Sequence, residues 1–242
     1  MNEIKKVLER RSERDYKNAP IEKEKIDQII NVINSAPTST NSQDFSAIIV
    51  DDQQLRLEIS QNLPTQKHIV NAPLFIIFCA DMNRINYVAQ QTQKTIYTNS
   101  INSFLTSAGD AFIAASFAVN AAIQLGLGTC YIGMVRGKLK EIQKALNLEG
   151  TIVPVVGLTI GYIATQQEIK PKINHVYISK YNLNQLHNEV DKYDLEMLNY
   201  YDTRSQNRTH NKWSQTCLNF FLQPSPLTSE IDAFIKNVWK IQ

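Results

Sequence analysis

The hydrophobic positions near the N-terminus predict two helices. Residues 2–9 form a short helical pattern with Ile4 and Val7 turned inward. Between residues 26 and 33, isoleucines recur at spacings of i, i+3, i+4 and i+7, which is typical of a helix with one buried face. Because Pro37 disfavours helical geometry at the residue before it, this second helix is expected to end near Ser35.

Short apolar runs predict strands in the middle of the chain. Residues 46–50 and 73–80 are expected to be buried strands, with a helix over 52–63 between them. A short strand over 129–133, a helix over 139–146 and a valine-rich strand over 152–161 follow. Strands and helices therefore alternate, although not with a regular βαβ rhythm.

The segment 110–125 predicts the central helix of the fold. Its small residues recur at spacings of three and four: Ala111, Ala114, Ala115, Ala118, Ala121 and Ala122. A stripe of alanines lets another backbone approach closely, so we expect this helix to be tightly packed. Gly126 suits the left-handed position that ends a helix.

The remaining segments are more polar. Residues 83–104 are expected to be helical, residues 166–181 are extended and irregular, and further helices are expected over 186–201, 213–222 and 231–239. This order of elements predicts an α+β fold, a mixed β-sheet flanked by helices with a helical C-terminal extension.

The length of 242 residues allows one large domain or two small ones. We expect a single domain over residues 1–242, with the extension over about 183–242.

Composition excludes several classes of protein. The chain has 25 Lys and Arg against 23 Asp and Glu, a net charge of +2, which argues against a strongly basic nucleic-acid binder. We expect no signal peptide, because the first residues are charged and lack an apolar stretch. No membrane partner is expected either, since the longest apolar run, Leu74 to Ala80, is far shorter than the roughly 20 residues of a membrane helix. Three scattered cysteines without a CxxC pair indicate a reducing, cytoplasmic location.

A cluster of arginines is the first candidate for chemistry. Arg10, Arg11 and Arg14 fall within five residues and surround Ser12. Guanidinium groups match phosphate and carbonyl oxygens with paired hydrogen bonds and keep their charge at all ordinary pH values. A solvated charged turn would have the same composition, so the spacing alone leaves both interpretations open.

Four further segments combine polar or glycine residues. The loop 37–43 carries hydroxyls and amides, the segment 126–133 has three glycines, residues 170–172 place two lysines around a proline, and residues 203–208 form a basic loop. Each also suits an ordinary turn or loop. The glycine segment is not a dinucleotide fingerprint, because it follows a helix and its third glycine is misplaced.

Other chemistries have no support in the sequence. The four histidines lie far apart and form no HxxxH or HExxH pattern, so no metal site is expected. The sequence has no GxSxG or P-loop pattern. Cys130 has no histidine nearby in the sequence and is interpreted as a small core residue.

Together the clusters resemble the flavin-dependent nitroreductase family, and most closely its NADPH-dependent, oxygen-insensitive nitroreductases and flavin reductases. Seven segments are similar to its motifs, in order along nearly the whole chain: Arg10–Tyr16 (R-S-x-R-x-[FY]), Ala36–Gln43 (A-P-[ST]-S-x-N-x-Q), Gln66–His68 (Q-K-H), Phe78–Asp81 (F-C-A-D), Gly126–Gly133 (G-L-G-x-x-Y-I-G), Lys170–Lys172 (K-P-R) and Tyr200–Arg204 with Trp213-Ser214 (Y-Y-x-x-R…W-S).

The resemblance implies an FMN-containing homodimer with both active sites at the subunit interface. It implies hydride transfer from NADPH, or from NADH, to bound FMN, and then transfer of two electrons to small acceptors such as nitroaromatics, quinones or free flavin. The flavin carries the chemistry, so no side chain is expected to act as a catalytic acid or base.

The resemblance also implies which residues form the site. FMN would be bound by Arg10, Arg11, Ser12, Arg14, Gln66, Tyr131, Ile132, Gly133, Lys170 and Lys172, and by Ser39, Thr40 and Asn41 of the partner subunit. NADPH would be bound by Arg204 and Arg208.

The chain departs from the family pattern at a few positions. Met134 stands where a second glycine is usual, Lys172 replaces an arginine, and Thr40 and Asn41 stand where serines are common. Two alternatives therefore stay open: a reductase that supplies reduced FMN to a partner oxygenase, and a non-catalytic flavin-binding module.

Overall fold

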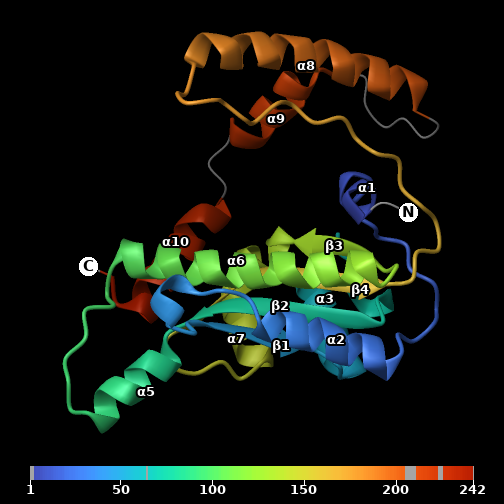
Figure 1. The fold of residues 1–242 in the computed structure, drawn as a ribbon. Helices are drawn as coiled ribbons and strands as arrows, with labels where there is room; N and C mark the ends of the chain where they lie inside the picture. The colour runs from blue at the N-terminus through green and yellow to red at the C-terminus, as the bar shows by residue number, and fades with distance from the viewer. Residues whose placement is uncertain (1–2, 64, 205–210, 223–225, 242) are drawn as a thin grey trace. The chain divides into compact units, whose positions relative to one another are not determined.

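The computed structural model describes all residues except 1–2, 64, 205–210, 223–225 and 242 (Figure 1). The chain divides into two compact units. The first contains residues 1–167 together with 227–242, and the second contains residues 168–226. Each unit has its own hydrophobic core and is described by itself.

The first unit is built on a four-stranded sheet. Its strands are β1 (Phe45–Ile49), β2 (Leu74–Asp81), β3 (Gly128–Ile132) and β4 (Ile152–Gly161), in the order β1-β2-β4-β3, and all neighbouring strands are antiparallel. The two central strands, β2 and β4, are buried along their whole length. The strand expected over 46–50 forms as β1, but it is an edge strand and only half-buried, so the expectation that it is buried is wrong.

Helices cover both faces of this sheet. Alternate residues of β2 point to opposite faces, so that Ile76 and Phe78 join one core cluster and Phe75 and Ile77 join the other. The first cluster lies under α2 (Lys23–Asn34) and α6 (Ile101–Gln124), which Figure 1 shows side by side across the sheet. The other face packs against α3, α4 and α7, which span Gln53–Asn62, His68–Asn71 and Leu139–Ala145.

The alanine-rich helix α6 is the central packing element, as the sequence predicts. Its predicted alanines are buried or half-buried against the sheet, and Gly126 follows it with a φ of 76°. The helix begins at Ile101, nine residues before the expected start, because Ser100 caps it by accepting a hydrogen bond from the Ser103 N–H. By length and composition alone α6 would pass as a membrane span, but nine of its residues are buried inside the protein.

Two shorter helices differ from the sequence-based expectation. α1 (Glu3–Leu8) forms as predicted, but Ile4 is 67% and Val7 42% exposed, so neither side chain is turned inward. The helix expected over 83–104 is α5 (Asn83–Gln91) followed by nine residues without helix before α6. Two 3-10 turns, η1 (Ser39–Asn41) and η2 (Gly133–Lys138), complete the connections.

The last helix, α10 (Pro226–Trp239), returns the chain to the first unit. Trp239 is 1% exposed, meets the Phe104 ring edge-on at 5.2 Å, and donates its indole N–H to Ser103 Oγ at 2.8 Å. These contacts fix the C-terminal helix against the N-terminal end of α6.

The second unit contains the long helix α8 (Leu183–Thr203) and α9 (Trp213–Phe221). Residues 166–181 contain no helix or strand, as expected. Tyr193, Met197 and Tyr201 of α8 form a small core with Trp213 beside them. Asp194 accepts hydrogen bonds from the backbone N–H and the hydroxyl of Ser214, at 2.8 and 2.5 Å, which holds α9 on α8.

Candidate functional site

The arginine segment lies along the free edge of the sheet. Ser12 forms a parallel bridge with Thr129 of β3, and the Glu13 N–H donates to Thr129 O at 2.9 Å. This isolated bridge is parallel, but the four named strands pair only antiparallel, whereas the sequence predicted a mixed sheet. The sequence left open a charged turn or an anion site here. In the structure the segment pairs with the edge strand β3 through this bridge.

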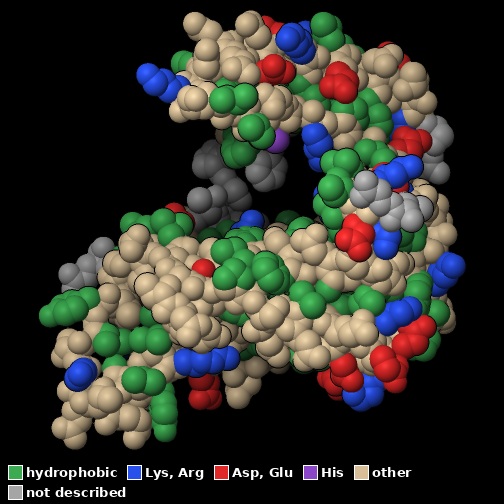
Figure 2. Space-filling model, viewed as in Figure 1, with side chains coloured by type: hydrophobic (Ala, Val, Ile, Leu, Met, Phe, Trp, Pro, Cys, Tyr) green, Lys and Arg blue, Asp and Glu red, His purple; other side chains and the backbone are tan. Residues whose placement is uncertain are grey.

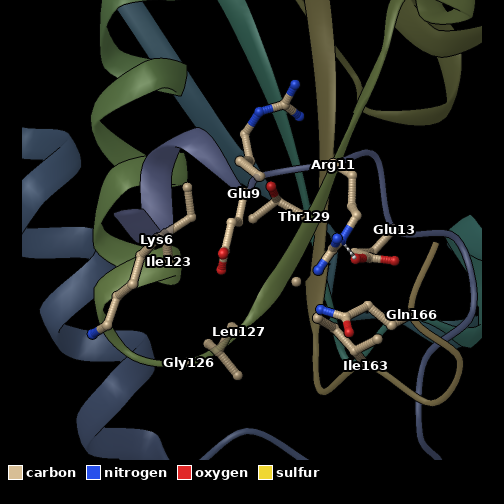
Figure 3. A pocket seen from close by; sticks show the side chains of 12 residues that line it. Lys6, Glu9, Arg11, Glu13, Ile123, Gly126, Leu127, Thr129, Ile163 and Gln166 are labelled. Carbon is tan, nitrogen blue, oxygen red and sulfur yellow. Dashed lines mark hydrogen bonds and ion pairs between the residues drawn. The ribbon is translucent and has the colours of Figure 1, made fainter. Parts of the chain in front are cut away.

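Arg11 and Glu13 are two residues apart on this bridged segment, and their side chains pair. Arg11 Nε lies 3.3 Å from Glu13 Oε1, and Glu13 Oε2 accepts the Gln167 N–H at 3.2 Å. Both side chains line a cavity of about 320 Å³ (Figure 3). Figure 3 shows the Arg11 guanidinium facing the Glu13 carboxylate, with Lys6 and Ile123 on the opposite wall. Arg10 also lines this cavity.

Arg14 lies close enough to His68 for its charge to act on the imidazole. Burial, assisted by the positive charge of Arg14, lowers the pKa of His68 to about 4. The imidazole is therefore neutral at pH 7, and its Nε2 has no hydrogen-bond partner among the residues that the structure describes. A neutral imidazole nitrogen that is buried and unpaired can accept or donate one hydrogen bond to a ligand.

Cys130 lies near the same arginines but is not activated by them. Burial raises the pKa of the Cys130 thiol, while Arg14, the Ser12 hydroxyl and Arg10 act in the opposite direction without overcoming it. The thiol therefore stays protonated. This agrees with the sequence-based interpretation of Cys130 as a small core residue.

Tyr16 holds the chain that follows the arginines. Its hydroxyl lies 2.8 Å from the carbonyl oxygen of Glu13 and 2.9 Å from Thr159 Oγ1 of β4. Burial raises the pKa of Tyr16, so the phenol remains neutral and can donate one of these bonds. Tyr16 thus ties the arginine segment to the middle of the sheet.

Two further expected site segments adjoin this edge. Arg10 lies close enough to Tyr131 for its charge to oppose the rise in that tyrosine's pKa, which burial causes. Tyr131 is 36% exposed at the end of β3, whereas Ile132 is buried. At Gly133 the Arg136 side chain is the nearest neighbour, 3.2 Å from where a Cβ would stand. Gln66 is half-buried just before α4, two residues from His68.

The loop 38–43 lies elsewhere in the first unit. Ser39, Thr40 and Asn41 are exposed, and the Ser39 N–H donates to Asp110 Oδ2 of α6 at 2.8 Å. Among the described residues, no hydrogen bond or ion pair joins this loop to the arginine segment. One chain by itself therefore does not bring the two groups together.

The other expected residues belong to the second unit. Lys170 Nζ lies 5.9 Å from the centre of the Tyr201 ring, and Lys172 is exposed. Arg204 Nε lies 3.3 Å from Glu168 Oε2, and its guanidinium lies over the Tyr200 ring at 5.8 Å. Arg208 falls outside the described residues.

Sequence reasoning missed two residues of this edge. His68 stands in the Q-K-H segment, but its burial beside Arg14 is a tertiary property. Glu13 is 3% exposed and stands between two arginines. Glu13 follows Arg11 by two residues, and this spacing in an extended segment could have predicted that the two side chains pair.

The donor set of this edge suits a flavin nucleotide. Arginine and serine donors match a phosphate, and cations match the polar edge of the ring. The unpaired Nε2 of buried His68 is the observation that a ligand at this position would explain. FMN is thus compatible with the residues that the structure gathers here.

Comparison with known proteins identifies the family of this chain. A model of the nitroreductase family matches residues 7–162, and a model of the nitroreductase family C-terminal domain matches residues 171–238. The FMN reductase [NAD(P)H] of Bacillus subtilis is 36% identical over 231 residues, covering 91% of this chain and 92% of the relative.

Solved structures are similar over the same extent. The B. megaterium NfrA2 structure has a TM-score of 0.93 and 32% identity, with all of both chains covered. The NADPH:FMN oxidoreductase of Vibrio harveyi, solved in complex with NAD+, has a TM-score of 0.86 and 25% identity, covering 100% of this chain and 99% of that chain.

The chain belongs to the nitroreductase family and is an oxidoreductase. Within the family it falls in the group of NAD(P)H-dependent flavin reductases and nitroreductases. The resemblance and the α+β fold expected from the sequence are both confirmed.

Proposed function

We propose that this protein is a cytoplasmic oxidoreductase that binds FMN and transfers a hydride from NADPH to it. Two electrons then go to a nitroaromatic, a quinone or free flavin in a second half-reaction. The observation that carries the proposal is the arginine segment on the edge of β3, with the buried, neutral and unpaired His68 beside Arg14. NADH is a second possible donor.

The cofactor would be held by groups from several elements. We assign to FMN the residues on and near the sheet edge and those of the loop and the second unit: Arg10, Arg11, Ser12, Arg14, Gln66, Tyr131, Ile132, Gly133, Lys170 and Lys172, with the partner's Ser39, Thr40 and Asn41. His68 joins this set because its unpaired Nε2 lies near Arg14.

FMN, when bound, supplies the two-electron chemistry of both half-reactions. The chain's own residues bind and orient it and adjust the local charge. Arg14 would stabilise the negative charge that accumulates on the ring's polar edge, which favours acceptance of a hydride. The neutral His68 adds a hydrogen bond without adding a second positive charge. No side chain is required as a general acid or base.

A homodimer would complete the site. In a single chain the exposed loop 38–43 does not meet the arginine segment, so a second copy would have to supply it. α6 presents exposed apolar residues for such an interface, among them Leu105, Phe112 and Ile113. Figure 2 shows hydrophobic side chains along the face that α6 forms. We also assign the helical extension, about residues 183–242, to contacts with the partner subunit.

The first experiment adds FMN to the purified protein and follows its absorption spectrum under anaerobic conditions. We expect a yellow protein that sediments as a dimer of about 55 kDa, twice the chain mass of 27.6 kDa. NADPH is expected to bleach the flavin, and a quinone or nitroaromatic to restore the colour. Failure to take up FMN would refute the proposal.

The same experiment separates the alternatives. Fast turnover of free FMN with slow nitro reduction would favour a reductase that supplies a partner oxygenase. Bound flavin that NADPH and NADH do not bleach would favour a non-catalytic flavin-binding module.

Arg204 tests the preference for NADPH over NADH. We propose that its guanidinium binds the additional phosphate of NADPH, because Glu168 and the Tyr200 ring hold it in place within the second unit. Replacing Arg204→Ala is expected to raise the KM for NADPH about tenfold, the effect of losing one charge-assisted hydrogen bond. The KM for NADH should change little. Equal changes for both donors would contradict the assignment.

A further inference from the structure

Two buried carboxyl groups lie beneath the loop 38–43. Asp44, just before β1, is 3% exposed, and Asp110 of α6 is 5% exposed. Their carboxyl groups are close enough to hydrogen-bond to each other. Two buried negative charges at this distance repel strongly, so one proton shared between the two groups relieves the repulsion.

Within the described residues, neither of these carboxyl groups forms an ion pair with a cation. Burial first, and the hydrogen bond and charge of Asp110 next, raise the pKa of Asp44 to about 6, while the Ser42 hydroxyl and the backbone act in the opposite direction. Asp81, whose N–H donates to the Asp44 carbonyl oxygen, pairs with Arg84, and the nitrogen and oxygen of that pair are 3.6 Å apart. Arg84 also donates to the carbonyl oxygens of Gln43 and Phe45. In the part of the chain that the structure describes, no ion pair reaches Asp44 or Asp110.

Asp110 is also the anchor of the loop. Its Oδ2 accepts the N–H of Ser39 at 2.8 Å. Thr40, Asn41 and Gln43 have φ values of 50°, 58° and 56°, a backbone conformation that residues other than glycine rarely adopt. Such a backbone persists only where its surroundings hold it. The bond from Ser39 to Asp110 is therefore a principal contact that keeps the loop in this shape.

The backbone of Asp44 is well fixed by hydrogen bonds, whereas its carboxyl group has few partners. Its carbonyl oxygen accepts the Asp81 N–H at 2.9 Å and the Ser107 hydroxyl at 2.5 Å. Its Oδ1 has no ordinary hydrogen-bond partner among the described residues. The fixed backbone thus keeps the Asp44 side chain near Asp110, where the two carboxyl groups can share a proton.

We propose that Asp110 is a positioning residue for the loop 38–43 and that a proton shared with Asp44 keeps it in place. With the proton bound, the pair carries one negative charge and Asp110 holds the Ser39 N–H. Without it, two like charges repel and the loop loosens. The proposal extends the proposed function and rests on it in one respect, because Ser39, Thr40 and Asn41 would contact the FMN of the partner subunit.

The sign of the pH dependence follows from the shared proton. A carboxyl group whose pKa is raised on folding binds its proton more tightly in the folded than in the unfolded protein. Its contribution to stability is fully present below its ordinary pKa and is lost as the pH rises through about 6. The loop is therefore expected to be better ordered at pH 5.5 than at pH 8.

The test compares the wild-type protein with Asp44→Asn at both pH values. Hydrogen exchange of the peptide that covers residues 38–45 is measured without flavin and corrected for the chemical exchange rate. We expect the wild type to lose about fourfold in protection between pH 5.5 and pH 8, the change that one proton with a pKa of about 6 gives over this range. Asp44→Asn cannot ionise and can donate to Asp110, so its protection should be independent of pH.

Affinity for FMN is the second measurement. The Kd of the wild type should rise by up to about fourfold over the same range relative to that of Asp44→Asn. The FMN phosphate itself titrates near pH 6, but it does so equally with both proteins and cancels in the comparison. If the protein binds no FMN, the proposed function fails, while the exchange measurement still tests the carboxyl pair.

Variants of Asp110 complete the design. Asp110→Asn keeps an oxygen for the Ser39 N–H and removes the repulsion between the two carboxylates. Its protection should depend on pH less than that of the wild type, because burial alone still raises the pKa of Asp44. It can replace Asp44→Asn if that variant does not fold. Asp110→Ala removes the acceptor, and the loop should exchange fast at both pH values. Equal pH dependence in the wild type and Asp44→Asn, or full protection in Asp110→Ala, would overturn the proposal.

Discussion

Replacing Arg14→Ala is expected to weaken the binding of FMN by about 10- to 150-fold and to slow flavin reduction by NADPH. A charge-assisted hydrogen bond contributes about 1.5–3 kcal/mol, which corresponds to this range of affinity. The guanidinium stands beside the neutral His68 on the edge of β3, so its removal takes away a positive charge where the flavin is proposed to bind. Fluorescence titration with FMN and anaerobic stopped-flow absorbance measure the two effects.

Three controls make this result specific. Arg14→Lys keeps the charge but loses the paired geometry, so it should fall between the wild type and Arg14→Ala. Lys23→Ala removes an exposed cation paired with Asp27 on α2 and should bind FMN like the wild type. Without flavin, NMR should show the pKa of His68 rising in Arg14→Ala, yet staying below its ordinary value because burial is the larger cause. Unchanged FMN affinity in Arg14→Ala would refute the assignment.

Replacing Trp239→Ala is expected to cost the first unit about 3–5 kcal/mol in free energy of unfolding. Trp239 is 1% exposed, packs edge-on against Phe104 and donates to Ser103, so the change removes a large buried side chain and one hydrogen bond. Because typical proteins are stable by only 5–15 kcal/mol, this is a large fraction of the total. Denaturant unfolding followed by circular dichroism measures it.

The matched variant is Trp239→Phe. It keeps an aromatic ring against Phe104 and loses the indole N–H, so it should cost about 0.5–1.5 kcal/mol in hydrogen bonding, plus a smaller loss of packing. Trp239→Ala should therefore be clearly less stable than Trp239→Phe. A loss below about 1 kcal/mol in Trp239→Ala would show that α10 is not held to α6 by this contact.

The local pattern of hydrophobic and polar residues was sufficient to predict most helices and strands. β4 has the bounds predicted for it, and the alanine stripe of α6 identified the helix that packs on the sheet, because both patterns depend on burial along a single element. The pattern failed where the fate of a side chain depends on a neighbour far away in sequence. Ile4 and Val7 are apolar but exposed, and the early start of α6 depends on the cap at Ser100.

The candidate site, too, could be predicted from the sequence only in part. The motif around Arg14 named the segment, but its chemistry depends on contacts with residues far away in sequence. Arg11 and Glu13 line the cavity together, whereas the charge of Arg14 acts on His68. Asp44 and Asp110 are 66 positions apart, and nothing in the sequence indicates that they share a buried environment.

By itself, the sequence determined the family, the order of helices and strands, and the segments that carry cations, because these are properties of residue type and local spacing. The tertiary structure decided which of these groups are buried, which are paired and which stand unpaired. The physical reason is that burial sets the cost of charge. The neutral state of His68 and the shared proton of Asp44 arise only when distant segments exclude water around them.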